Sequence, residues 1–182
     1  MSLKKTKFNR GDSGFTIVEL LVVIVVIAIL AAITIVSYTN VTTKAKAAQA
    51  QANGNSVQQV AESYNADAGY YPKTLAALRA GFGSSPTATL PTGITLITGQ
   101  SGAAGAYTTP ATDPIATAST TTDGPKTISY ACAAALATTD CSTISPAGAR
   151  IEYWDYGTGA RAIIYVGTAS AASNFSITGL GA

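Results

Sequence analysis

The chain has 182 residues, of which 47% are hydrophobic and 11% are charged, whereas about a quarter of the residues in an ordinary soluble domain are charged. Four basic residues against one acidic residue give the first 14 positions a charge of +3, and seven against eight give the remainder −1. A basic tip on a nearly neutral body is typical of a membrane topology signal. It argues against a general nucleic-acid binder, which would carry a basic patch on its folded part.

The N-terminal region joins a basic stretch to a long apolar run. Residues 20–43 contain no charge, and at ~1.5 Å per residue a helix of this length reaches about 36 Å, enough to cross a hydrocarbon core of about 30 Å. The basic flank predicts a cytoplasmic start and an exported C-terminal part. A general secretory signal is cut after its apolar region. Here the expected cut lies before it, after Gly14, so that the apolar helix is kept.

Glu19 is a lone carboxylate at the start of this apolar helix. A charged side chain costs roughly 2.5 to 3.5 kcal/mol at the centre of a membrane on insertion scales, and less near its edge. One interpretation places Glu19 in the head-group zone, where it favours the positive helix N-terminus. The other interpretation gives it a functional partner of opposite charge.

Residues 14–20, Gly-Phe-Thr-Ile-Val-Glu-Leu, resemble the prepilin processing motif of type IV pilins and type II secretion pseudopilins. The resemblance covers the leader and the apolar segment through Tyr38, and more loosely the helix after that segment. It implies that a prepilin peptidase cuts between Gly14 and Phe15 and N-methylates the Phe15 amine. It also implies that Glu19 neutralises the amino terminus of a neighbouring subunit during assembly. Two buried opposite charges tolerate each other, whereas deleting one strands the other.

Two positions depart from the family pattern. Many pilins carry a helix-weakening glycine within the apolar segment and a proline near its end, where the helix melts in the filament. The matching positions here hold Ala28 and Val36, neither of which breaks a helix. We therefore expect less melting between Ala28 and Val36 than is usual for the family.

From Tyr38 onward, apolar residues recur at steps of three and four, which predicts an amphipathic helix. The expected apolar stripe consists of Val41, Ala45, Ala48, Ala52, Val57, Val60, Ala61 and Tyr64. Gly54 and the asparagines beside it predict a bend. The helix is expected to end before Gly69.

The rest of the chain predicts a small head. A Gly-Tyr-Tyr-Pro turn at residues 69–72, with a short helix after it, resembles the segment that comes after the first helix in many pilins and pseudopilins, and its tyrosines are expected to cap the core. Strand-like runs lie at residues 94–97, 127–131, 150–156 and 161–166. A hairpin is expected at residues 157–160. The predicted fold is α+β, with the long helix packed on a small antiparallel sheet of three or four strands.

Four segments result from these assignments: a cleaved basic leader at 1–14, a transmembrane or filament-core helix at 15–38, an amphipathic half-helix at 39–68 and a globular head at 69–182. Within the head, residues 98–125 are rich in Thr, Ala, Ser and Gly and predict a long surface loop. One interpretation is that this loop coats a filament, as an O-glycan acceptor or an adhesive face. The other is that it is a solvated, variable loop without a specific function. Two N-glycan patterns, at Asn40 and Asn174, are discounted because such short motifs arise by chance.

Cys132 and Cys141 are the only cysteines, and histidine is absent. In an exported domain, two cysteines nine positions apart predict one disulfide closing a short loop. The alternative is a pair of free buried thiols in a cytosolic protein. Two thiols are too few for a typical metal site.

These observations leave several functions open. The first is a structural subunit of a type IV pilus, and the second is a pseudopilin of a type II secretion system or a minor pilin. A membrane-anchored enzyme and an anchored non-polymerising binding protein are the remaining alternatives. Neither a nucleophile with a base nor a carboxylate cluster is evident, so no catalytic, cofactor-binding or metal residue is expected.

The expected partners are further copies of the chain, a prepilin peptidase, the inner-membrane pilus assembly machinery and the membrane itself before assembly. No specific nucleic acid is expected. The precursor would lie in the cytoplasm and inner membrane, and the mature chain in an extracellular pilus on the cell surface. Adhesion, twitching motility and DNA uptake all remain open as the purpose of such a fibre.

Overall fold

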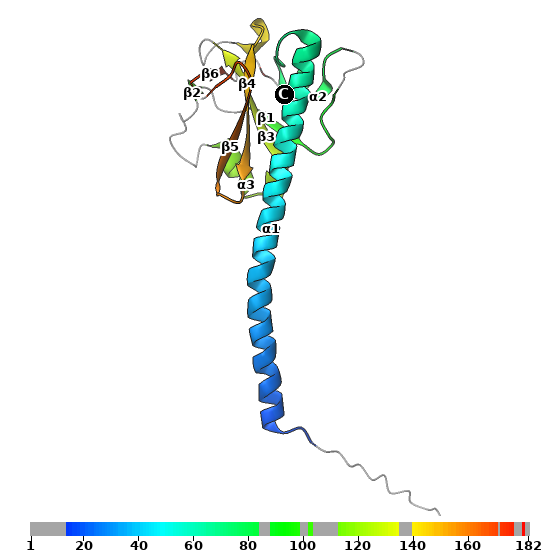
Figure 1. The fold of residues 1–182 in the computed structure, drawn as a ribbon, viewed down its shortest axis with the longest axis vertical. Coiled ribbons are helices and arrows are strands. Elements are labelled where there is room, and N and C mark those ends of the chain that lie inside the picture. Colours follow the sequence, from blue (N-terminus) through cyan, green and yellow to red (C-terminus); the bar gives the residue numbers. More distant parts are fainter. Residues whose placement is uncertain are drawn as a thin grey trace, which may run out of the picture. The chain divides into compact units, whose positions relative to one another are not determined.

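The computed structural model describes residues 14–83, 88–98, 102–103, 113–134, 140–170, 172–176 and 180. Residues 1–13, which make up nearly all of the expected leader, lie outside this part. The chain divides into two compact units, Met1–Val41 and Thr42–Ala182. Helix α1, Ile17–Ala68, runs through the boundary between them, and each unit is described by itself (Figure 1).

In the first unit, residues 17–41 are helical throughout, as the sequence predicts. Two of its threonine side chains bond to the helix's own backbone. The hydroxyls of Thr34 and Thr39 donate to the carbonyl oxygens of Ala31 and Ile35, each at 2.9 Å, so that neither hydroxyl needs water. Backbone and side-chain hydrogen bonds closed within one helix are suited to a hydrocarbon environment. Reduced melting of residues 28–36 in a filament stays a prediction.

In the second unit, α1 packs its residues 42–68 against the head. The apolar stripe predicted to face the head is confirmed in its C-terminal half only. Four of its members are buried: Val57, Val60, Ala61 and Tyr64. The other four are exposed: Val41, Ala45, Ala48 and Ala52. Ala50 and Gly54 are buried in their place. Alanines lie on every side of this stretch, so hydropathy alone does not select the buried face.

Gly54 serves close packing. A Cβ at this position would lie 2.7 Å from Cδ1 of Tyr153 and 3.5 Å from Cδ1 of Ile164. The helix continues without interruption through Gly54, and the bend expected there stays a prediction. It ends at Ala68, before Gly69, as predicted. Gly69 comes next with φ of 80°, the left-handed conformation that commonly terminates helices.

The second unit contains two short helices and six strands in the described residues. In chain order these are α2 Leu75–Ala80, β1 Thr95–Thr98, β2 Gly102–Ala103, α3 Pro114–Ser119, β3 Thr127–Ala134, β4 Gly148–Asp155, β5 Ala160–Gly167 and β6 Asn174–Ser176. Short 3₁₀ turns lie at Gly124–Lys126 and Cys141–Thr143. The strand order is β2-β6-β3-β4-β5, and β1 pairs with β3.

The α+β class is confirmed, and so are the four predicted strands and the hairpin. β4 pairs antiparallel with β5 along their full lengths, and Gly159 in the turn has φ of 66°. The sheet has more strands than three or four, because β2 and β6 are too short to show a period in the sequence. It is also mixed, since β1 runs parallel to β3. Parallel neighbours need a long crossover connection, and residues 99–126 provide it.

The expected surface loop at residues 98–125 is therefore only partly a loop. It contains α3, whose Ile115 is 1% exposed. Asp113 caps this helix, with its Oδ1 accepting the backbone N–H of Ile115 at 2.9 Å, and Pro114 occupies the first turn. An Asp-Pro pair is a typical helix start, and it is the signal that the loop interpretation overlooked. Residues 99–101 and 104–112 lie outside the described part.

Both faces of the sheet are covered, which explains why β4 shows no simple alternation. Ile151, which is fully buried, belongs to the core cluster that includes Val57 of α1, and Tyr153 contacts Gly54. The opposite face of β4 carries Arg150 and Glu152, each 1% exposed. This is the face on which α3 lies. A strand buried on both faces loses the period of two that marks a half-exposed strand.

A charge network holds α3 to this second face. Arg150 Nε lies 3.0 Å from Glu152 Oε1, and Arg161 Nη2 lies 3.3 Å from Asp113 Oδ2. Arg161 Nη1 also lies 3.4 Å from Glu152 Oε1, and Ser129 Oγ donates to Glu152 Oε2 at 2.7 Å. These ion pairs and the Ser129 hydrogen bond offset part of the cost of burying the charges.

Candidate functional site

The predicted cleavage site lies at the start of the described chain. Gly14, Phe15 and Thr16 are not helical, and α1 begins at Ile17. The Phe15 side chain is 86% exposed. A Cβ on Gly14 would meet no atom within 4 Å. The Gly14–Phe15 bond is thus an open peptide outside regular structure, the form in which a peptidase binds its substrate.

Thr16 and Glu19 form a reciprocal cap on the first turn of α1. The backbone N–H of Thr16 donates to Glu19 Oε2 at 2.9 Å, and the Thr16 hydroxyl donates to the same oxygen at 2.8 Å. In return, the Glu19 N–H donates to Thr16 Oγ1 at 3.2 Å. This is a capping box, in which two otherwise unpaired backbone donors at a helix start are satisfied.

The cap places the Glu19 carboxylate at the N-terminal end of its own helix. Both donors of Thr16 use Oε2, and Oε1 has no partner among the described residues. The carboxylate can therefore keep the cap and accept a positive charge at the same time. A capping box at residues 16–19 is readable from the sequence as Thr-x-x-Glu, a signal that the helix-dipole and assembly-partner interpretations of Glu19 leave out.

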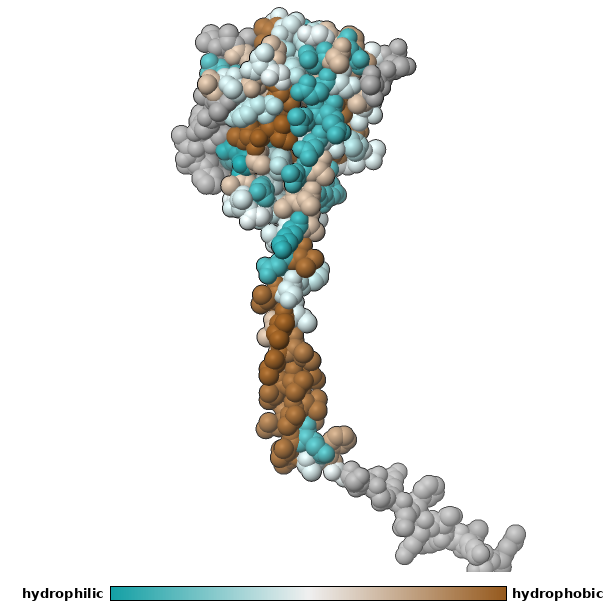
Figure 2. All heavy atoms as spheres, viewed as in Figure 1, coloured by the Kyte–Doolittle hydropathy of each residue, from teal (hydrophilic) through white to brown (hydrophobic). Residues whose placement is uncertain are grey.

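The helix beyond this cap exposes apolar side chains in every direction. Each large hydrophobic side chain from Ile17 to Val36 is at least 47% exposed, with Val25 the least. Figure 2 shows this part of α1 covered with hydrophobic atoms. A helix that is apolar all round needs an apolar surrounding, either lipid or packed protein. Its length and composition are sufficient to cross a membrane.

In the head, Cys132 and Cys141 form a disulfide with an S–S distance of 2.02 Å. Both residues are fully buried. The bond ties β3 to the Cys141–Thr143 turn, and Asp140 caps this turn by accepting the N–H and hydroxyl of Ser142. These two hydrogen bonds lower the pKa of Asp140.

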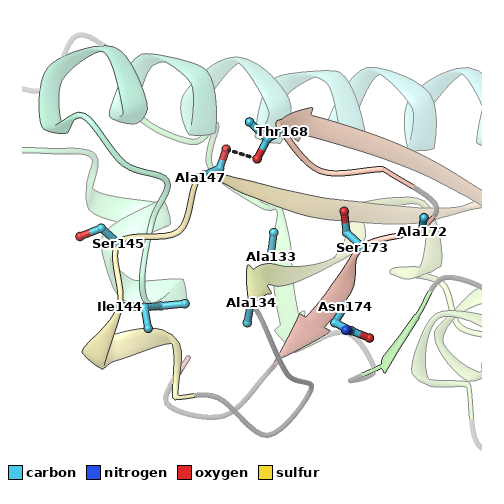
Figure 3. Close-up of a pocket in the computed structure, with 9 residues that line it drawn as sticks. All are labelled: Ala133, Ala134, Ile144, Ser145, Ala147, Thr168, Ala172, Ser173 and Asn174. Atoms are coloured by element: carbon cyan, nitrogen blue, oxygen red, sulfur yellow. Dashed lines mark hydrogen bonds between the residues drawn. The ribbon is translucent and has the colours of Figure 1, made fainter.

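A hollow of about 500 Å³ lies next to the end of β3 and the start of β6 (Figure 3). It is lined by Ala133, Ala134, Ile144, Ser145, Ala147, Thr168, Ala172, Ser173 and Asn174. None of these side chains is charged, and the one hydrogen bond drawn between them joins the Thr168 hydroxyl to the Ala147 carbonyl at 3.3 Å. In the part of the chain that the structure describes, no three carboxylate or thiol side chains converge as metal ligands.

Comparison with known proteins gives one match, at the N-terminal end. Residues 9–35 match the family described as the prokaryotic N-terminal methylation motif. No curated protein and no solved structure matches the chain significantly. The motif implies processing by a prepilin peptidase and assembly into a filament, and with the apolar helix it suggests a membrane-anchored precursor. The chain carries the prepilin-type signature of type IV pilins and pseudopilins.

Proposed function

We propose that the chain is a structural subunit of a type IV pilus. The precursor is held in the inner membrane by residues 15–38, is cut after Gly14, is N-methylated at Phe15 and polymerises through its N-terminal helix. The observation that carries the proposal is the apolar surface that surrounds α1 directly after the cleavage site. Lipid covers it before assembly, and other copies of the same helix cover it afterwards.

Glu19 acts as the assembly charge. Cutting after Gly14 creates an ammonium group at Phe15, and both this group and the Glu19 carboxylate enter an apolar core. Burying either charge alone is costly, whereas the two neutralise each other when a neighbouring subunit brings its Phe15 amine to Glu19. The capping bonds of Thr16 support this role, because they hold one carboxylate oxygen and leave the other for the amine.

The remaining residues coat the filament. Residues 39–68 form the amphipathic half of the helix and residues 69–182 the head. The buried disulfide fits an exported, oxidising environment. The Thr-rich, charge-poor composition of residues 98–125 supports an external fibre, on which the head serves adhesion or motility. A pseudopilin would instead stay within the cell envelope in a short polymer.

Mechanical shearing tests this proposal. Cells producing the wild-type chain should release long fibres of it into the medium, while cells producing Glu19→Ala should release few or none. The Glu19→Ala chain should still insert in the membrane, because removal of a charge from a membrane helix favours insertion. Wild-type protein that is processed but stays in the envelope fraction would favour the pseudopilin or minor pilin alternative. Normal fibre yield from Glu19→Ala would refute its assembly role.

A further inference from the structure

A hollow of about 360 Å³ lies where α1 meets the end of β4, and we name it the α1–β4 hollow. Lys44 and Gln51 line it from α1, with two alanines between them, and Tyr153 and Asp155 line it from β4. The two helix positions are seven residues apart, a rise of ~10 Å. The volume falls within the ~300–1,000 Å³ of small-ligand sites. A small polar group can therefore enter it.

Two opposite charges line the α1–β4 hollow. Among the residues that the structure describes, Lys44 has no ion pair. The Asp155 carboxylate accepts the N–H of Gly157 at 2.8 Å and the hydroxyl of Thr158 at 3.0 Å. These hydrogen bonds lower the pKa of Asp155, so the carboxylate is charged at neutral pH, and each of its oxygens has a second lone pair for a further donor. The lysine and the carboxylate can therefore each bind an opposite charge of one ligand.

Two contacts give the direction of β4 along the helix. The Tyr153 ring lies against Gly54, whereas Tyr156, which comes three positions later, has its ring centre 5.6 Å from the Lys46 ammonium. The chain of β4 therefore runs toward the N-terminal, apolar end of α1. Asp155 lies between these two tyrosines in sequence, and so beside a part of α1 farther from the apolar segment than the lysine of the hollow. That lysine also leans toward the apolar segment, because helical side chains point toward the helix N-terminus.

Lys44 is the first charged residue after the apolar run, 25 positions beyond Glu19. A helix rises ~37 Å over this distance. That is more than the ~30 Å of a hydrocarbon core and less than the ~40–45 Å of a bilayer with its headgroups. The exposed Tyr38 lies one to two turns earlier, at the depth where aromatic side chains anchor membrane helices. In a membrane-held precursor, Lys44 therefore lies among the headgroups of the leaflet on the exported side.

We propose that the α1–β4 hollow of the precursor binds a phospholipid headgroup that carries both a phosphate and a primary ammonium, as phosphatidylethanolamine does. Lys44 donates to the phosphate, and the lipid ammonium donates to Asp155, in charge-assisted hydrogen bonds. A lipid presents its phosphate next to the glycerol and its amine farther from the hydrocarbon, which is the order of the lysine and the carboxylate along α1. The inference rests on the membrane-held precursor of the proposed function.

Other occupants leave one of the two charges without a suitable partner. A phosphatidylglycerol headgroup has a phosphate but no ammonium, so its negative charge meets the Asp155 carboxylate as well as Lys44. A phosphatidylcholine headgroup has a quaternary ammonium with no N–H to donate, and so loses the hydrogen bond to the carboxylate. The hollow should therefore select the headgroup with a primary amine over both.

Native mass spectrometry of the full precursor tests this selection. The chain is extracted from membranes in mild detergent and mixed with equal amounts of dioleoyl phosphatidylethanolamine, phosphatidylglycerol and phosphatidylcholine. The ethanolamine lipid should be retained about fivefold or more above each of the others, as expected for one ion pair. Equal retention of the three lipids would overturn the proposal. So would its displacement by an equal amount of soluble phosphoethanolamine, or a lipid-free dimer, which would assign the hollow to a second copy.

Variants of the two charges locate the site. Lys44→Gln should lower retention of the ethanolamine lipid about fivefold or more, while Lys46→Gln is the matched control, since its ammonium lies over the Tyr156 ring. Asp155→Asn should bring ethanolamine and choline lipids to similar retention. Full retention with Lys44→Gln, or an equal loss with Lys46→Gln, would contradict the site. These measurements precede assembly, so their failure leaves the fibre proposal to its shearing test, whereas a chain absent from membranes would remove both.

Discussion

The ring of Tyr153 lies against the backbone of Gly54, so close that a methyl group at position 54 would come within 2.7 Å of Cδ1. This contact joins α1 to β4 at the point where the helix crosses the sheet. This contact favours Gly at position 54, whereas helix propensity favours Ala. Gly is less favourable than Ala in a helix by about 1 kcal/mol, yet only Gly leaves room for the ring.

Gly54→Ala should therefore destabilise the head. The gain in helix propensity is about 1 kcal/mol, and overpacking a well-packed site costs about 1–3 kcal/mol. We expect a net loss of up to about 2 kcal/mol, measured as a lower thermal midpoint of the full chain in detergent. In a chain that already carries Tyr153→Val, Gly54→Ala should instead raise the thermal midpoint, because the ring no longer crowds the added methyl group and only the gain in helix propensity remains. A full gain of about 1 kcal/mol from Gly54→Ala alone would show that the contact is not tight.

Thr16 should matter for fibre formation through Glu19. Thr16→Ala removes the hydroxyl from the capping box and costs about 0.5–2 kcal/mol at the first turn, while it frees the carboxylate to adopt other positions. We expect a lower fibre yield with Thr16→Ala and a near-normal yield with Thr16→Ser, which keeps the hydroxyl. Equal yields from the two variants, normalised to the amount of cleaved subunit, would show that the cap has no part in assembly.

The disulfide should stabilise the head measurably. For two cysteines nine positions apart, loop entropy gives about 2–3 kcal/mol. Cys132→Ala/Cys141→Ala should lower the thermal midpoint of unfolding accordingly, and prolonged reduction of the wild-type chain should shift it the same way. An unchanged midpoint in the double variant would contradict this stabilisation.

Removing one member of the buried charge network should destabilise the head far more than removing one member of an exposed ion pair. Arg161→Ala leaves Asp113 and Glu152 buried without this partner, and breaking a buried pair in this way costs about 3–5 kcal/mol. Lys126→Ala breaks an ion pair with Asp123 whose side chains are 43% and 69% exposed. That change should cost less than about 1 kcal/mol. Chemical denaturation of both variants compares them directly, and equal losses would contradict the burial argument.

Acid should weaken the β4–β5 hairpin. The Gly157 N–H and the Thr158 hydroxyl lower the pKa of Asp155 below 3.8. The unfolded chain therefore binds this proton at a higher pH than the folded chain, so the stabilisation is complete above about pH 5 and is lost as the pH falls through the folded-state pKa. Asp155→Asn should reduce the slope of thermal midpoint against pH in this acid range. An identical slope in both proteins would contradict the assignment.

The sequence predicts the fold best where a pattern is long or chemically unambiguous. The apolar run, the end of α1 before Gly69 and the β4–β5 hairpin are all determined by local residues. The buried face of α1 is not, because Ala48, Ala50 and Ala52 are chemically alike, and only packing against the head decides which of them is covered. The charge network is equally invisible, since Asp113 and Arg161 meet only after residues 99–126 cross the sheet.

At the candidate site, too, the sequence predicts the local features and the structure adds the contacts. Residues 14–19 define a short, local motif, and the sequence is sufficient to predict the cut, the methylated residue and the carboxylate. The structure adds the set of hydrogen bonds that ties Glu19 to Thr16.

The mass of the N-terminal peptide of the fibre subunit tests most directly whether this chain is a processed pilus subunit. Fibres sheared from cells are digested, and the first peptide of the main subunit is identified by mass spectrometry. We predict a chain that begins at Phe15 and carries one additional methyl group on its amine. A subunit that retains residues 1–14, or that begins after the apolar segment, would contradict this prediction.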